Sequence, residues 1–312
     1  MIRRIETLAD EVRASGQKRN VVVAAADDAD TLMTARDAWA RGIADMTLVG
    51  PTEGIQRLAK EAGVDLAPFR IVDAQGDEAC IRESIRLVRE GTCEIVMKGR
   101  VRTADLMSEI LRRSNGLRTE RIVSHIGAFT APGEDRVMII TDAGINIAPD
   151  LSRKRDIILN AVDVMHALGI VCPKVAVLSF IERSDSTQII HPGIKQATED
   201  AENLTELCKQ GQIPGCVVEG PLALDNAISP YAAARKNIQS EVSGCADILV
   251  AHDINMGNAI YKALQCWSKV VFASVVVGSR TPVVVPSRAD SKASKLQSIA
   301  LTVLLMGRGA AK

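Results

Sequence analysis

The sequence predicts an α/β fold in which mostly parallel sheets carry helices on both faces. Short runs rich in Val, Ile and Ala alternate with longer segments whose apolar residues recur at helical spacing. The strand runs are almost continuously apolar, which is typical of parallel strands covered on both sides. At 312 residues, the chain is long enough for one large domain or two ordinary ones.

The first part of the chain repeats a strand-then-helix pattern after an amphipathic helix at residues 1–16. Strands are expected at 20–26, 45–50, 69–74 and 94–99, and helices at 28–42, 54–62, 77–91 and 103–113. Asp28 or Asp30 is expected to cap the first helix of this series, and Thr103 the last. This regular alternation indicates parallel strand pairing.

In the middle of the chain, the alternation of strands and helices is interrupted by two consecutive strands. Runs at 124–132 and 136–143 read as adjacent strands joined at Pro132-Gly133, which favours antiparallel pairing. The alternation then returns, with helices expected at 152–169, 197–211, 257–267 and 294–306 and strands at 174–180, 215–221, 245–253, 270–279 and 283–285. The final helix is expected to pack on the first half of the chain.

Composition excludes several classes of protein. Lys+Arg and Asp+Glu both number 38, and this zero net charge argues against nucleic-acid binding and gives no polybasic membrane signal. No signal peptide or apolar stretch of about 20 residues is present, so a cytoplasmic protein is expected. The seven cysteines are scattered, never spaced C-x-x-C, and expected to be mostly buried.

Polar clusters follow five of the expected strands, where ligands bind in open α/β sheets. Their candidate residues are Lys98, Arg100 and Thr103; Asp142 and Asn146; Asp225; Asp253 and Asn258; and Ser287, Arg288, Asp290 and Ser291. Guanidinium groups beside a helix start can bind an anion. Turn chemistry and helix capping are the alternative for each cluster, but the fivefold repetition favours a ligand.

Missing motifs narrow the chemistry further. The chain has no P-loop, no G-x-G-x-x-G after its first strand and no G-x-S-x-G elbow. The four histidines are dispersed, which disfavours a metal site, and His166 reads as structural because it lies inside a helix.

Five segments, in this order, resemble the phosphate acetyl/butyryl transferase family. They are "MKGRVRTADLMSEIL", "TDAGINIAPDL", "GPLALDNAIS", "ADILVAHDINMGNAIYKAL" and "VVVGSRTPVVVPSRADS". The resemblance spans about Lys98 to Ser291 and is nearest to the phosphate butyryltransferase branch. It implies that acyl-CoA and phosphate are converted reversibly to acyl phosphate and CoA, without a cofactor, by a dimer or larger homo-oligomer.

The implied fold is that of isocitrate and isopropylmalate dehydrogenases, with a cleft between two domains. Residues 1–125 and 286–312 would form the first domain, and 126–285 an inserted second domain. Phosphate acetyltransferase is the alternative activity. A metal- and NAD-dependent dehydrogenase fits less well, since no "HGSAPD"-like loop is found; a non-catalytic binding protein is a third possibility.

The resemblance also assigns roles to residues. Ser287 and Arg288 match a Ser-Arg pair that holds phosphate and polarises the carbonyl, with Asp290 as a third catalytic candidate. The implied phosphate or substrate contacts are Lys98, Arg100, Thr103, Asp142, Asn146 and Ser291, and the CoA contacts Asp225, Asp253, Asn258 and Ser279. One departure matters: the acetyl branch places a thiol base seven residues after the serine, where this chain has Ser294. The identity of the base is therefore open.

Overall fold

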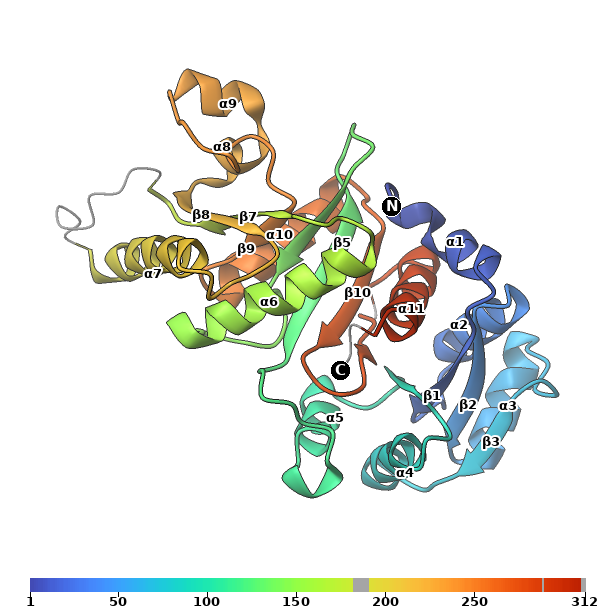
Figure 1. Cartoon of the computed structure of the whole chain (residues 1–312). Helices are drawn as coiled ribbons and strands as arrows, with labels where there is room; N and C mark the ends of the chain where they lie inside the picture. Colours follow the sequence, from blue (N-terminus) through green and yellow to red (C-terminus); the bar gives the residue numbers. More distant parts are fainter. Residues whose placement is uncertain (182–190, 288, 310–312) are drawn as a thin grey trace. The chain divides into compact units, whose positions relative to one another are not determined.

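The computed structural model describes residues 1–181, 191–287 and 289–309. The chain forms two compact units (Figure 1). The terminal unit contains Ile5–Arg121 and Val271–Lys312, and the middle unit contains Met1–Arg4 and Ile122–Val270. The domain boundaries expected from the sequence stay a prediction.

The terminal unit is a strand-and-helix alternation, as predicted. Its elements are η1 (Ile5–Thr7), α1 (Leu8–Ala14), β1 (Arg19–Ala24), α2 (Ala29–Ala40), β2 (Ala44–Gly50), α3 (Thr52–Ala62), β3 (Arg70–Asp73), α4 (Asp77–Arg89), β4 (Ile95–Lys98), α5 (Thr103–Ile110), η2 (Arg113–Asn115), β10 (Phe272–Val277), β11 (Val283–Val284) and α11 (Lys292–Gly307). The strands lie in the order β3-β2-β1-β4-β11-β10. Neighbours are parallel except β10 and β11, which are antiparallel.

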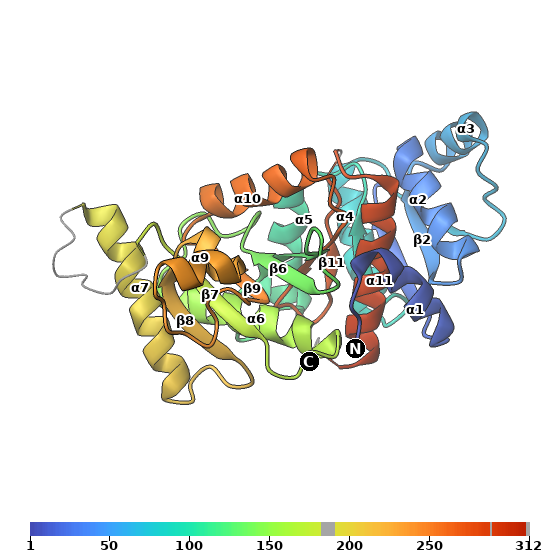
Figure 2. The ribbon, with the colours of Figure 1, turned by 90° about the horizontal axis from the view of Figure 1, so that it is seen from above.

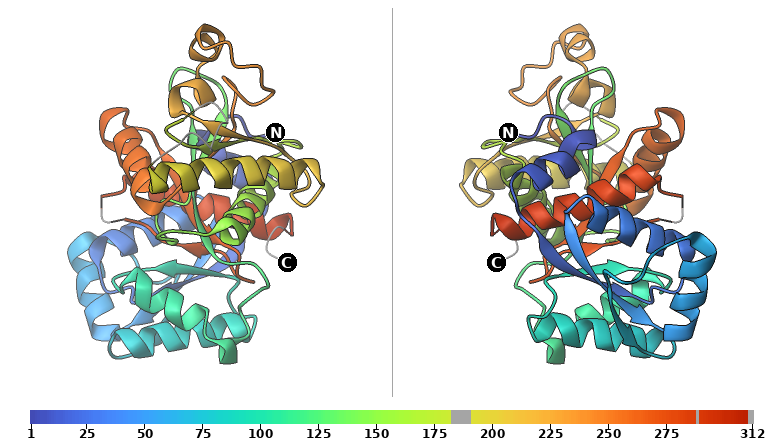
Figure 3. Two further views of the ribbon diagram at one scale, coloured as in Figure 1. Left: turned by 90° about the vertical axis from the view of Figure 1, so that its left-hand side faces the viewer. Right: turned by 90° about the vertical axis from the view of Figure 1, so that its right-hand side faces the viewer.

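Helices cover both faces of the terminal unit's strands. Figure 3 shows α1 and α11 on one side of the strands and α4 and α5 on the other. Helix α11 packs on β10 and contacts α1 and α2, so the predicted return of the last helix to the first half is confirmed. Residues Ser294–Leu305 of α11 are all buried, which makes this helix the centre of the unit's core.

The middle unit combines one antiparallel strand pair with parallel strands. Its elements are β5 (Ser124–Thr130), β6 (Val137–Thr141), α6 (Leu151–Ala167), β7 (Lys174–Leu178), α7 (Pro192–Lys209), β8 (Val217–Leu222), α8 (Leu224–Ile228), α9 (Pro230–Arg235), β9 (Ile248–Val250) and α10 (Ile254–Trp267). The strand order is β5-β6-β9-β7-β8. The β5–β6 pair is antiparallel, as Pro132-Gly133 predicted, and the other pairs are parallel.

Helices also cover both faces of the middle unit's strands. Figure 2 shows α6 and α10 on opposite sides of β6 and β9. Helix α7 packs against α6, β7 and β8. No helix in the described part of the chain is long and apolar enough to span a bilayer.

Two local predictions were wrong. Thr103 does not cap α5; it is the first helical residue, after Arg102, whose side chain makes no capping hydrogen bond. The cysteines were expected to be mostly buried, but only Cys80 and Cys93 are buried; the other five are partly or fully exposed.

Candidate active site

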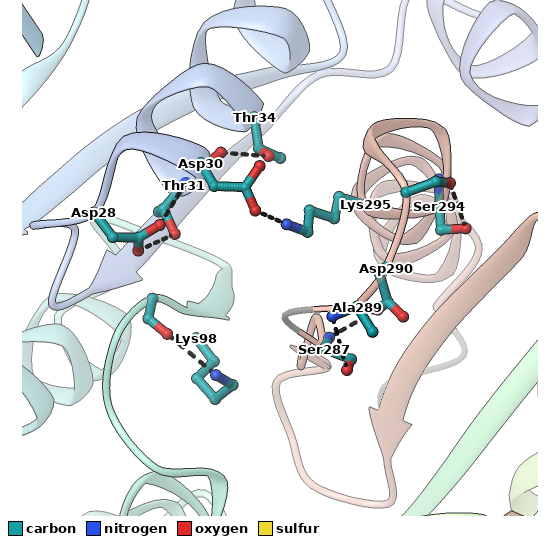
Figure 4. Close-up of polar contacts among 12 residues, drawn as sticks. Asp28, Asp30, Thr31, Thr34, Lys98, Ser287, Ala289, Asp290, Ser294 and Lys295 are labelled. Atoms are coloured by element: carbon teal, nitrogen blue, oxygen red, sulfur yellow. Dashed lines mark hydrogen bonds and ion pairs between the residues drawn. The ribbon is translucent and has the colours of Figure 1, made fainter. Parts of the chain in front are cut away.

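Three strands of the terminal unit bring predicted site residues to one edge. Strand β4 lies between β1 and β11 and is parallel to both, so the carboxyl ends of all three strands meet there. Lys98 ends β4, and the Ser287 turn follows β11. Figure 4 shows Lys98 and the Ser287 turn on two sides of this edge, each bonded within its own turn, with Asp28 and Asp30 nearby. The parallel order therefore joins the first and last predicted clusters.

A glycine allows the end of β4 to lie against the end of β1. A Cβ on Gly99 would be 2.1 Å from the carbonyl oxygen of Ala25, so no larger residue fits. The N–H of Gly99 donates to Ala24 O (3.0 Å), and the N–H of Arg100 donates to Ala25 O (2.9 Å). These contacts fix the backbone from which the Arg100 side chain projects.

The Arg100 guanidinium lies between two carboxylates. Nε is 3.0 Å from Asp27 Oδ2 and Nη2 is 2.8 Å from Asp77 Oδ1, with 41% of the side chain exposed. Burial lowers the pKa of Arg100, but hydrogen bonding to Asp27 and the charges of both acids outweigh it and raise the pKa. An incoming anion must therefore compete with these acids for a cation that they already orient.

Lys98 and Thr103 complete the cluster after β4. The Lys98 ammonium donates to the carbonyl oxygens of Gly99 (3.1 Å) and Val101 (3.4 Å). Thr103 is partly exposed in the first turn of α5, where N–H groups have no partner within the helix. Cations and helix N–H groups here can together bind an anion.

The Ser287 turn is held by its own side chains. The Ser287 N–H donates to Asp290 Oδ2 (2.7 Å), and the Asp290 N–H donates back to Ser287 O (3.0 Å). Ser291 caps α11 by accepting the Ser294 N–H (3.1 Å), so the helix-capping alternative for this cluster applies to Ser291. Asp290 orients Ser287. The predicted catalytic Arg288 lies outside the described residues.

Sequence reasoning missed an ion pair at the same edge. Lys295 is 5% exposed and its ammonium donates to the Asp30 carboxylate, as Figure 4 shows. Burial lowers the pKa of Lys295, and the charge of Asp28 opposes this effect. A lysine among the apolar positions of a helix needs an anionic partner, and that was the available signal.

The middle unit uses its predicted residues differently. Asp142 is 2% exposed and accepts the N–H groups of Gly144 (2.8 Å) and Ile145 (2.9 Å). It also accepts Asn146 Nδ2 (2.7 Å), which in turn donates to Val123 O (2.9 Å). Asp142 and Asn146 thus lock the loop after β6.

The four CoA candidates also make internal contacts. Asp253 caps α10 through the Met256 N–H (2.9 Å), and Asn258 Nδ2 donates to Ala143 O (3.1 Å). Asp225 pairs with Lys236 (2.9 Å) on the surface. Ser279 follows β10, which runs antiparallel to β11, so it is not brought to the edge that carries Ser287. Its hydroxyl is buried and donates to Thr281 O (2.7 Å).

A buried charged network was also missed. The Lys154 ammonium lies 2.5 Å from Asp200 Oδ2, and the two side chains are 1% and 6% exposed. The same ammonium lies 2.8 Å from Nδ1 of His252, which follows β9. Burial and the Lys154 charge lower the pKa of His252. Since an ammonium only donates, Nδ1 must accept, and Nε2 carries the proton.

An apolar pocket of about 470 Å³ lies beyond the ends of β7 and β8. It is lined by Leu178, Ser179, Phe180, Ala223, Leu224, Lys236, Met256 and Ile260. Within the described residues, no group of three or more His, Cys, Asp or Glu side chains could hold a metal ion. The pocket suits a ligand with an apolar body and a polar or anionic group near Lys236.

Comparison with known proteins gives matches along nearly the whole chain. Residues 5–87 and 80–303 match the family described as "Phosphate acetyl/butaryl transferase". The chain is 39% identical over 307 residues to a phosphate butyryltransferase of Clostridium acetobutylicum, covering 98% of this chain and 99% of that protein. It is 38% identical to a phosphate acetyltransferase of Thermotoga maritima, covering 96% and 99%.

Solved structures show the same likeness. A branched-chain phosphotransacylase from Enterococcus faecalis V583 superposes with a TM-score of 0.79 at 27% identity, over 92% of this chain and 98% of that one. A 4-hydroxythreonine-4-phosphate dehydrogenase from Burkholderia phymatum, at 15% identity, gives a TM-score of 0.57 over 92% and 98%. The second match shows the fold alone. The predicted α/β, dehydrogenase-like fold class is confirmed.

Proposed function

The chain belongs to the phosphate acetyl/butyryl transferase family, and we propose that it transfers a butyryl group between CoA and phosphate. That it is a phosphate acyltransferase follows from the family. The observation that supports an oxyanion subsite is the parallel pairing of β4, which ends at Lys98 just before Arg100, with β11, which the Ser287 turn follows. The expected substrates of the enzyme are acyl-CoA and phosphate.

We propose that phosphate binds at this edge, held by Lys98, Arg100 and Thr103 together with Ser287, Arg288 and Ser291. One phosphate oxygen attacks the thioester carbonyl; a C–O bond forms, the C–S bond breaks and CoA leaves as a thiol or thiolate. Ser287 and Arg288 stabilise the negative charge that develops on the carbonyl oxygen. Both substrates need only to be positioned together, so no covalent enzyme intermediate is required.

The proton of the CoA thiol needs an acceptor in the reverse direction, since an unperturbed thiol has a pKa of about 8.5. Asp290 is our candidate, and its contact with the Ser287 N–H places its carboxylate within the same turn. A pH profile of Asp290→Asn tests this role. Loss of the acid limb supports a base, whereas a uniform decrease at every pH assigns Asp290 only to positioning Ser287.

We assign the CoA contacts to Asp225, Asp253, Asn258 and Ser279, with Asp142 and Asn146 shaping the substrate loop. The apolar pocket beside Lys236 is the proposed site for an apolar part of acyl-CoA, because its lining combines apolar side chains with Lys236, which pairs with Asp225. We further propose a cytoplasmic homo-oligomer, a dimer or larger, which light scattering of the purified protein tests.

Thiol release in phosphate buffer, compared for acetyl-, butyryl- and isobutyryl-CoA, tests the reaction and its specificity. We expect the highest kcat/KM with butyryl-CoA, because each buried methylene contributes about 0.8 kcal/mol. A higher kcat/KM with acetyl-CoA would favour the acetyl activity, which the relative from Thermotoga maritima carries by name. Absence of thiol release with all three would contradict the acyltransferase reaction.

The site assignment has its own test. We expect Arg288→Ala to lower kcat/KM for phosphate at least about 100-fold, the loss typical of removing one oxyanion-stabilising group. Arg82→Ala is the matched control, because Arg82 lies on α4, is 60% exposed and pairs with Glu78 of the same helix. Near wild-type rates for Arg288→Ala at saturating phosphate would overturn the assignment.

A further inference from the structure

Two cysteines of the middle unit are brought together by a tight loop. Cys208 lies in the last turn of α7, and Cys216 stands immediately before β8. Gly211, with a φ of +76°, ends the helix, and the Gln212 N–H donates to Leu207 O (2.9 Å). At Gly215 the chain turns again with a φ of +78°. These turns fold the segment back on the end of α7.

The sulfur atoms of Cys208 and Cys216 both contact the carbonyl oxygen of Ile213. Cys208 Sγ is 3.6 Å and Cys216 Sγ is 3.8 Å from Ile213 O. Cys208 Sγ is also 3.6 Å from the carbonyl oxygen of Cys216 itself. Both residues are partly exposed, so a small molecule in solution can reach them. The pair lies before β8, whereas the predicted ligand residues of this unit follow the strands.

We propose that Cys208 and Cys216 are a redox-active dithiol, which a small disulfide in solution oxidises to an intramolecular disulfide. The thiolate of Cys208 attacks one sulfur of the small disulfide, forming a mixed disulfide and expelling one thiolate. Cys216 then loses its proton to solvent and attacks Cys208 Sγ, which expels the second thiolate. The protein loses two hydrogen atoms, and the small disulfide is reduced to two thiols.

The environment of Cys216 sets the order of these steps. Burial, the charge of Cys208, a hydrogen bond with Cys208 and the charge of Cys172 raise the pKa of Cys216 to about 12. Cys216 therefore stays a thiol near neutral pH and is a poor first nucleophile. We therefore assign the first attack to Cys208 and the resolving step to Cys216, because a mixed disulfide at Cys208 removes the Cys208 charge that helps to raise the pKa of Cys216.

Titration of the native full chain with reduced and oxidised glutathione, followed by digestion without reduction and mass spectrometry, tests the proposal. We expect one linked peptide pair that joins Cys208 to Cys216 and lacks two hydrogen atoms. Its midpoint should not depend on protein concentration. Cys266, which is exposed on α10, is the internal control and should carry only a glutathione adduct.

Two variants separate the roles. Cys216→Ser should trap glutathione on Cys208, because no resolving thiol remains, and Cys208→Ser should abolish the linked peptide. Cys266→Ser should leave the linked peptide unchanged. A linkage of Cys216 to Cys172, or glutathione adducts on the exposed cysteines without any link between Cys208 and Cys216, would overturn the proposal. None of these readouts depends on acyl transfer.

Discussion

The two units present polar groups beyond the carboxyl ends of their strands in opposite ways. In the terminal unit, Arg100 is 41% exposed and its charge is balanced by side-chain carboxylates. In the middle unit, Asp142 is 2% exposed and is occupied mainly by backbone N–H groups. The same sequence pattern, a strand followed by a polar loop, thus gives a cation that an anion can reach in one unit and a locked loop in the other.

The largest effect is expected where the middle unit buries a charge. Lys154→Met leaves the Asp200 carboxylate in the interior without its cation, since Gln196 Nε2 (2.8 Å) is a neutral donor. Loss of one partner from a buried ion pair costs about 3–5 kcal/mol in the free energy of unfolding. Urea denaturation of the purified variant measures this cost.

The double variant Lys154→Met with Asp200→Leu is the control for that experiment. Removing both charges should recover much of the lost stability, because apolar replacement of a buried ion pair is often neutral. If Lys154→Met is as stable as wild type, Lys154 and Asp200 do not form a buried ion pair in the middle unit.

A smaller loss, in activity, is expected at the terminal unit's edge. Arg100→Ala removes a proposed phosphate contact and should lower kcat/KM for phosphate about 100-fold, which corresponds to about 2.7 kcal/mol. Initial rates over a range of phosphate concentrations measure it, with Arg82→Ala as the control. Wild-type kinetics in Arg100→Ala would show that the exposed cation of the terminal unit does not bind phosphate.

The element order could be predicted from sequence because its signals are local. Apolar strand runs, the Pro132-Gly133 turn and the Asp28 cap each depend on residues close in the chain. The polar clusters after β4 and β11 could also be predicted, because each directly follows an apolar run, but the pairing of these two strands could not. Thr103 failed as a cap because a hydroxyl that suits an N-cap also fits the first helical turn.

Long-range pairing could not be predicted in the same way. Asp30 and Lys295 are 265 positions apart, and Lys154 meets His252 across 98 positions. A sequence window shows a charged residue but neither its partner nor its burial. The prediction that the cysteines are mostly buried failed for the same reason. In sequence, Cys208 and Cys216 resemble small core residues, and only the folded loop shows that they are partly exposed.

A pH-dependent effect should distinguish the buried histidine from an exposed one. Burial lowers the pKa of His252 below its ordinary value of 6.5. The unfolded chain therefore binds a proton between 6.5 and the folded pKa while the native state does not. Stability is present above pH 6.5 and is lost as pH falls through that window, by at most about 1.4 kcal/mol per pH unit.

Unfolding free energies of wild type and His252→Gln across that range measure the slope. The variant should lose the part of the slope that His252 supplies. His166→Gln is the control: His166 Nε2 contacts Gly215 O (2.9 Å) at an exposed position, so the slope should persist. An unchanged slope in His252→Gln would show that the network does not hold a neutral imidazole.

The smallest effect is expected for the exposed pair of the middle unit. Hydrogen bonding to Lys236 lowers the pKa of Asp225; burial opposes this effect, and the Asn226 N–H adds to it. The contribution to stability is therefore present above the ordinary pKa of 3.8 and is lost as pH falls through the folded pKa. Asp225→Asn should cost no more than about 0.5 kcal/mol near neutral pH, because both side chains are in water. Urea midpoints at low and high salt measure it, and the difference should shrink in high salt. A loss as large as that of Lys154→Met would mean that exposure does not separate the weak charge pairs of this molecule from the strong ones.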